Sequence, residues 1–222
     1  LTGQFRVLRY DMPGHGLTDA TPLQDEARGY SIADLAGDAL ALLDALGIKT
    51  VSVCGLSIGG MVAQHLAAHA PERVARVILC DTAAVIGPPE VWNTRIAGIR
   101  KVGLPAIAPG VMERWFTEGF RARETHLLRG YINMVARTSL DGYLGCAMAV
   151  RDADLTASDT SIRQPTLVIV GADDPATPVA SAEALAGLIP GAQLAIIPDC
   201  SHICCVEQPE ETARLLLAHL GA

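Results

Sequence analysis

The sequence predicts an α/β fold in which a mostly parallel β-sheet carries helices on both faces. The chain has 222 residues, half of them hydrophobic, which is long enough to bury a core without disulfides or a metal ion. Short apolar stretches of strand length alternate with longer stretches of helical spacing, the pattern of βαβ units. Between residues 85 and 160 only helical stretches occur, and the alternation resumes after Pro165.

The first part of the chain supplies three predicted strands and two helices. Residues 5–10 alternate in polarity and predict a short strand that ends in a turn-rich loop. Ser31 is a candidate N-cap for a helix whose apolar positions continue to Leu46, and Gly47 predicts its end. Residues 51–54 predict a buried strand and residues 61–70 a helix. Residues 74–80 predict another apolar strand.

The rest of the chain divides into a helical segment and a second α/β segment. Residues 166–170 and 193–197 predict strands, and residues 179–188 and 209–220 predict helices. We therefore expect residues 1–84 and 161–222 to form one core, with residues 85–160 inserted over the sheet as a helical cap.

The composition argues against nucleic acid as a partner. Lys and Arg number 17 against 24 Asp and Glu, so the net charge is −7, and no basic cluster is present to bind a phosphate backbone. Aromatic residues are only 4% of the chain, too few for a surface on which bases stack.

Signals for membranes and export are also missing from the sequence. The longest stretch without Asp, Glu, Lys or Arg, residues 50–71, contains glycine, glutamine and histidine, whereas a membrane span is more uniformly apolar. No secretory signal opens the chain. The six cysteines, three of them within residues 200–205, do not form a disulfide scaffold. We expect a cytoplasmic protein with reduced thiols and no membrane partner.

A candidate nucleophile lies between a predicted strand and a predicted helix. Residues 55–59 read Gly-Leu-Ser-Ile-Gly, and the G-x-S-x-G pattern requires this strand–turn–helix context. The turn would expose the Ser57 hydroxyl at the carboxyl edge of the sheet. The Ile58 backbone N–H, at the positive end of the helix dipole, would face a developing oxyanion.

A serine nucleophile needs a base and an acid, and both occur on later loops. Asp173 and Asp174 follow the strand at residues 166–170. His202 follows the next strand, and the other histidines lie in helices, in the helical segment or in an early turn. Asp81, at the end of another strand, is the second choice for the acid.

A metal site is not expected around His202. Thiolates and imidazole suit zinc, but the spacing of Cys200, Cys204 and Cys205 around His202 is not that of a usual zinc site, and no second ligand pair occurs elsewhere. These thiols are better interpreted as small apolar fillers.

These motifs together resemble the α/β-hydrolase superfamily over nearly the whole chain. Residues 11–19 are similar to the family's D-x-x-G-H-G-x-S-D turn, with Thr18 in place of Ser, and residues 55–60 resemble its nucleophile elbow. Residues 171–178 fit G-x-x-D-x-x-x-P, a register that selects Asp174 over Asp173 as the acid. Residues 201–209 resemble the family's histidine loop.

Within the superfamily, the chain resembles the 3-oxoadipate enol-lactonases. The stretches that carry this resemblance are residues 34–38, 42–47, 67–74, 88–93, 113–117, 151–155 and 174–178. The resemblance implies hydrolysis of a small anionic enol-lactone from aromatic catabolism, the β-ketoadipate pathway, by Ser57, His202 and Asp174 without a cofactor. Alternatives are a carboxylesterase or a carbon–carbon-bond hydrolase with the same triad, or a non-catalytic ligand-binding relative. The oligomeric state, including a homo-oligomer, stays open.

An anionic substrate calls for a cation in its pocket, and Arg suits a carboxylate best. Arg114 and Arg151 are the candidates, with Trp115 as an apolar wall; exposed helix-face charges are the competing interpretation of both arginines. The chain also begins directly before the predicted strand at residues 5–10. The strands that precede it in relatives, and the loop that donates a second oxyanion N–H, are therefore expected to be absent, which leaves an inactive truncated chain as an alternative.

Overall fold

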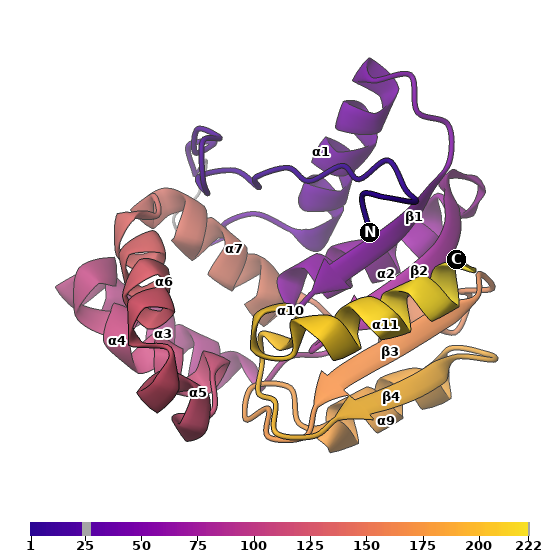
Figure 1. The fold of residues 1–222 in the computed structure, drawn as a ribbon. Helices are drawn as coiled ribbons and strands as arrows, with labels where there is room; N and C mark the ends of the chain where they lie inside the picture. Colours follow the sequence, from indigo (N-terminus) through magenta and orange to yellow (C-terminus); the bar gives the residue numbers. More distant parts are fainter. Residues whose placement is uncertain (24–27, 222) are drawn as a thin grey trace.

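In a computed structural model, which describes residues 1–23 and 28–221, four parallel strands form the sheet. They are adjacent in chain order (Figure 1), so each connection crosses to the next strand. The strands are β1 (Val51–Leu56), β2 (Val74–Cys80), β3 (Thr166–Gly171) and β4 (Gln193–Ile197). The four strands predicted from residue 51 onward are confirmed.

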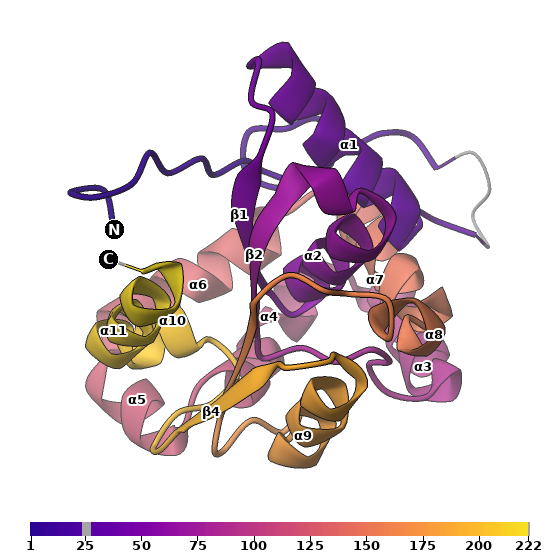
Figure 2. The same cartoon turned by 90° about the vertical axis from the view of Figure 1, so that its right-hand side faces the viewer.

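Helices cover both faces of this sheet, as Figure 2 shows. On one face lie α1 (Ile32–Ala45), α2 (Ile58–His69) and α9 (Val179–Leu188), and on the other lies α11 (Pro209–Leu220). The α1 helix begins as predicted, because Ser31 and Asp34 form a reciprocal capping box. It ends at Ala45, and Gly47 follows with a φ of 67°, a left-handed conformation that favours glycine.

The two faces of β2 show how the core is divided. Val77 and Leu79 pack into the cluster beneath α1 and α2, whereas Ile78 and Cys80 pack into the cluster beneath α11. Side chains alternate between the faces of a strand, so a continuous apolar strand needs cover on both sides. This requirement explains why helices occupy both faces.

Between β2 and β3 the described chain is helical, as the sequence predicted. The helices are α3 (Pro89–Val102), α4 (Leu104–Trp115), α5 (Glu118–Arg123), α6 (Thr125–Arg137), α7 (Leu140–Asp152) and α8 (Thr156–Asp159). The arrowheads of the strands in Figure 1 point toward α3–α6. The helical block therefore lies beyond the carboxyl ends of the strands, where loops carry functional residues. Two short helices complete the fold, a 3₁₀ turn (Pro71–Arg73) and α10 (Cys204–Glu207).

One predicted strand is wrong. Residues 5–10 form no strand, and nearly all of them are exposed. Alternating polarity favours an extended chain, but a strand also needs a neighbour with which to exchange hydrogen bonds, and this segment runs away from the sheet (Figure 2). Within the described residues β1 pairs only with β2, so Ser52 and Cys54, expected to be buried, are exposed.

A search of the described helices for one long and apolar enough to cross a bilayer finds none.

Candidate active site

Ser57 lies on a strained turn at the carboxyl end of β1. Its φ and ψ are 56° and −121°, a conformation that non-glycine residues rarely adopt unless their surroundings impose it. The turn is held from β2: the Ser57 N–H donates to the Cys80 carbonyl at 2.9 Å, and the Thr82 hydroxyl donates to the Ser57 carbonyl at 2.7 Å. The α2 helix begins at the next residue, Ile58, so the predicted strand–turn–helix context is present.

Two glycines make this turn sterically feasible. A Cβ atom on Gly55 would lie 2.0 Å from the Gly59 carbonyl oxygen, and one on Gly60 would lie 2.5 Å from the Thr82 side chain. A Cβ on Gly59 would contact nothing within 4 Å. The tight fit therefore falls on Gly55 and Gly60, and not on the second glycine of the sequence pattern.

Asp174 and His202 form a buried pair. The His202 Nδ1 atom lies 2.8 Å from Asp174 Oδ2, and the two residues are 5% and 4% exposed. With its proton on Nδ1, the imidazole donates to the carboxylate and leaves Nε2 free to accept a proton. This is the arrangement that a general base and its orienting acid require.

The loop after β3 fixes the Asp174 carboxylate. Its Oδ1 accepts hydrogen bonds from the N–H groups of Ala176 and Thr177, at 2.7 and 3.1 Å, and its Oδ2 accepts one from the Thr177 hydroxyl at 2.6 Å. Burial raises the pKa of Asp174, but the hydrogen bond and charge of His202, with the bonds from Thr177, outweigh it, so the pKa is lowered. Asp174 is therefore poised to remain ionised beside the imidazole.

The three predicted triad residues follow β1, β3 and β4 and so share the carboxyl edge of one parallel sheet. The structure joins Asp174 and His202 directly. The Ser57 side chain does not cap α2, and its hydroxyl makes no hydrogen bond within the described part of the chain, so it is not already engaged. The Ile58 N–H lies at the amino end of α2, where the helix dipole favours negative charge.

The helical block contacts the histidine loop through Arg114 and Trp115. The Ser201 hydroxyl donates to the Arg114 carbonyl at 3.3 Å, and the Ile203 N–H donates to the Trp115 carbonyl at 3.2 Å. Both contacts are made by the backbone of α4. Arg151 lies instead at the end of α7, where its guanidinium donates to Asp152 at 2.6 Å and to Asn93 at 3.2 Å.

Sequence reasoning missed Arg95, a half-buried cation on α3. Its guanidinium lies 5.2 Å from the Trp92 ring centroid and 5.8 Å from that of Tyr143, and it donates to the Tyr143 hydroxyl. Its Nε is buried without a hydrogen-bond partner, and it forms no ion pair with any described residue. Burial, and then the nearby Arg95 charge, lower the pKa of Arg114. The sequence indicated part of this cluster, because Trp92 and Arg95 are three residues apart on one helix. It did not indicate that Tyr143 lies beside them.

Among the residues that the structure describes, no three His, Cys, Asp or Glu side chains lie close enough together to hold a metal ion. Cys80, Cys200 and Cys204 instead pack in the apolar cluster beneath α11. Burial raises the pKa of the Cys200 thiol, and the nearby Cys204 thiol and carboxylates raise it further, so this thiol stays neutral.

Two of the proteins to which the chain is similar in sequence are named enol-lactonases. Over 207 residues the chain is 39% identical to 3-oxoadipate enol-lactonase 2 of Acinetobacter baylyi, covering 93% of this chain and 75% of that protein. It is 32% identical to 3-oxoadipate enol-lactonase 1 of the same organism, covering 95% of this chain and 77% of that protein.

The fold of the chain is also similar to that of solved structures. The enol-lactonase from Burkholderia xenovorans superimposes with a TM-score of 0.93 at 39% identity, covering 98% of this chain and 82% of that one. A hydrolase from Pseudomonas aeruginosa superimposes with a TM-score of 0.92, also at 39% identity, covering 98% of this chain and 80% of that one. Residues 1–215 match the alpha/beta hydrolase family. The chain is therefore a member of the alpha/beta hydrolase family and has the fold of its enzymes.

Proposed function

We propose that this chain hydrolyses a small enol-lactone bearing a carboxylate, converting 3-oxoadipate enol-lactone to 3-oxoadipate. The observation that carries the proposal is the buried Asp174–His202 pair at the sheet edge that also bears the strained Ser57 turn. The similarity to proteins named 3-oxoadipate enol-lactonases supports the choice of substrate.

The reaction is an acyl transfer in two steps. Ser57 attacks the lactone carbonyl while His202 takes the hydroxyl proton and Asp174 stabilises the imidazolium. The Ile58 N–H faces the oxyanion of the tetrahedral intermediate. The ring C–O bond then breaks, and the enol oxygen receives the proton from His202 and tautomerises to a ketone. Water, deprotonated by His202, attacks the acyl-enzyme and releases the carboxylic acid and Ser57.

A covalent probe tests the nucleophile. A fluorophosphonate is expected to label one serine stoichiometrically, with the mass increase on the peptide that contains Ser57. Ser57→Ala should abolish labelling, whereas Ser52→Ala, which changes an exposed serine of the preceding strand β1, should leave it intact. Absence of labelling in the unaltered chain would contradict the proposal and favour a non-catalytic ligand-binding relative.

Substrate preference is measured separately. Ultraviolet loss of the enol-lactone should proceed with a higher kcat/KM than hydrolysis of p-nitrophenyl acetate. The reverse ranking would indicate a carboxylesterase, and turnover of a carbon–carbon-bond substrate alone would indicate the other alternative.

Two arginines of the helical block fit the carboxylate of such a substrate. Arg95 retains an unused donor in its Nε–H group, and the Arg114 carbonyl accepts a hydrogen bond from the histidine loop. Arg95→Gln and Arg114→Gln should raise KM for the anionic lactone on the order of tenfold, the loss of one charge-assisted hydrogen bond, and change KM for p-nitrophenyl acetate little. Arg123→Gln is the control, because Arg123 is exposed and paired with Glu124. Equal effects on both substrates would contradict this assignment.

A further inference from the structure

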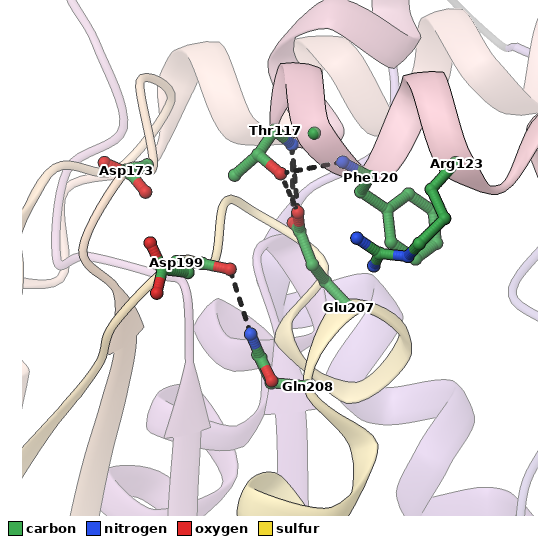
Figure 3. A pocket seen from close by; sticks show the side chains of 8 residues that line it. Thr117, Phe120, Arg123, Asp173, Asp199, Glu207 and Gln208 are labelled. Carbon is green, nitrogen blue, oxygen red and sulfur yellow. Dashed lines mark hydrogen bonds between the residues drawn. The ribbon is translucent and has the colours of Figure 1, made fainter.

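Glu207 is a buried carboxylate that the triad does not use. It is the last residue of α10 and is 7% exposed. Its Oε2 accepts a hydrogen bond from the Ser201 N–H at 2.9 Å. Its Oε1 accepts one from the Thr117 N–H at 3.1 Å and another from the Thr117 hydroxyl. The carboxylate therefore joins the histidine loop to the N-cap of α5 (Figure 3).

The partners of Glu207 define what this position requires. Two of the three are backbone N–H groups, which can only donate, and the Thr117 hydroxyl also directs its proton to the carboxylate. An ionised carboxylate accepts from all three, whereas an amide of the same shape would turn an NH₂ group toward a donor. A buried N–H group that loses its acceptor destabilises the folded protein by the full desolvation penalty of that group.

Hydrogen bonds hold the backbone on both sides of His202, and Glu207 accepts one of them, from the Ser201 N–H. Ser201, the preceding residue, also donates through its hydroxyl to the carbonyls of Arg114 and Asp173, at 3.3 and 3.4 Å. Ile203, the following residue, donates to the Trp115 carbonyl. The direction of the imidazole follows from the backbone at these two neighbours, and catalytic geometry is sensitive to displacements of about 1 Å.

The segment that Glu207 holds in place borders a cavity. A cavity of about 250 Å³ lies beside the carboxylate, lined by residues that include Thr117, Asp173, Asp199 and Gln208. Figure 3 shows the Glu207 carboxylate directed toward Thr117. The contacts to Thr117 and Ser201 therefore hold a loop that borders solvent-accessible space.

From this arrangement we propose that Glu207 is a positioning residue, which holds the His202 loop against the α4–α5 turn so that the imidazole stays aligned with Asp174. The inference rests on the proposed hydrolase function for its catalytic consequence. The alignment itself is a structural property that can be observed without turnover.

Glu207→Gln tests this inference with two independent readouts. We expect kcat for ester hydrolysis to fall on the order of 10²-fold, as for a small misplacement of a catalytic group, with KM nearly unchanged. We also expect the NMR signal of the His202 Nδ1 proton, which reports its hydrogen bond to Asp174, to shift upfield or broaden. Glu210→Gln, an exposed glutamate three residues later, should change neither quantity.

Variants of Thr117 keep the test valid if Glu207→Gln folds poorly. Thr117→Val removes the hydroxyl donor and keeps the N–H, whereas Thr117→Ser keeps both. The valine variant should show the same upfield shift in smaller degree, and the serine variant should match the unaltered protein. An unchanged Nδ1 signal and kcat in a folded Glu207→Gln variant would overturn the inference. If the unaltered chain shows no hydrolysis, the proposed function fails, and the Nδ1 signal still decides whether Glu207 positions the imidazole.

Discussion

Buried carboxylates occur in two different surroundings in this molecule. At the carboxyl edge of the sheet, Asp81, Asp174 and Glu207 each accept hydrogen bonds from two or more residues. Asp159, at the end of α8, is 0% exposed, and neither of its carboxylate oxygens has a hydrogen-bond partner among the described residues. Both regions bury their carboxylates, and they differ in the hydrogen-bond donors that they provide.

The difference shows that donors, and not burial alone, set the charge state of a buried acid. The pKa of Asp174 is lowered although burial raises it, because His202 and Thr177 favour the ionised form. Burial raises the pKa of Asp159 to about 7, with the charge of Asp154 adding to the effect. Asp81 is intermediate, since burial raises its pKa to about 6 although the Cys204 thiol, the Gly171 N–H and the charge of His202 lower it.

The largest expected effect is on Asp174. Asp174→Asn removes the charge that orients and stabilises the imidazole, so kcat for the enol-lactone should fall on the order of 10⁴-fold, as it does when the acid of a serine-protease triad is changed to its amide. Steady-state hydrolysis measures the loss. Asp173→Asn, an exposed neighbour, is the matched control and should stay close to the unaltered activity. Full activity of Asp174→Asn would move the role of the acid to Asp81.

Asp159 should carry the largest effect on stability. The pKa of its folded form, about 7, lies above the ordinary 3.8. The folded chain therefore binds this proton more tightly than the unfolded chain, and the associated stability, present below about pH 4, is lost as the pH rises through about 7. At pH 8 Asp159→Asn should be more stable than the unaltered protein by on the order of 3 kcal/mol.

Urea unfolding at pH 4.5 and pH 8 checks this prediction. The two proteins should differ much less at the lower pH, because Asp159 is neutral in the folded state there. Some decline with pH should remain in the variant, because the pKa of Asp81 is also raised. Parallel pH profiles for the two proteins would show that Asp159 has an unrecognised partner.

The same substitution, Asp to Asn, should destabilise the protein at Asp81. Its Oδ1 accepts the Gly171 N–H at 2.8 Å, and its Oδ2 accepts the Cys204 N–H at 3.4 Å, so it links the end of β3 to α10. Asp81→Asn turns an NH₂ group toward one of these donors and should lower the free energy of unfolding by about 2 kcal/mol. Chemical denaturation at pH 7 measures it, and a stabilised variant would contradict the comparison.

The sequence was sufficient for the features that depend on local pattern. The positions of β1 to β4 follow from short apolar runs, and the loops of Ser57, Asp174 and His202 follow from the strands that precede them. It was insufficient where a property depends on a distant partner. Alternation at residues 5–10 could not reveal that the segment has no neighbouring strand. The targets of Glu207 and the isolation of Asp159 depend on which groups the fold brings near each carboxylate.

The smallest effect is expected where a carboxylate is paired at the surface. Asp44 accepts a hydrogen bond from Arg73 at 2.8 Å, as short as the Asp174–His202 contact, but its side chain is 65% exposed. Water solvates the carboxylate when the pair is broken, and Arg73 keeps its bonds to the carbonyls of Ile48 and Lys49. Asp44→Asn should therefore lower the free energy of unfolding by less than about 1 kcal/mol, measured by urea denaturation at pH 7. A loss as large as that of Asp81→Asn would mean that contact distance matters more than solvent access, and the contrast between the two buried regions would lose its physical basis.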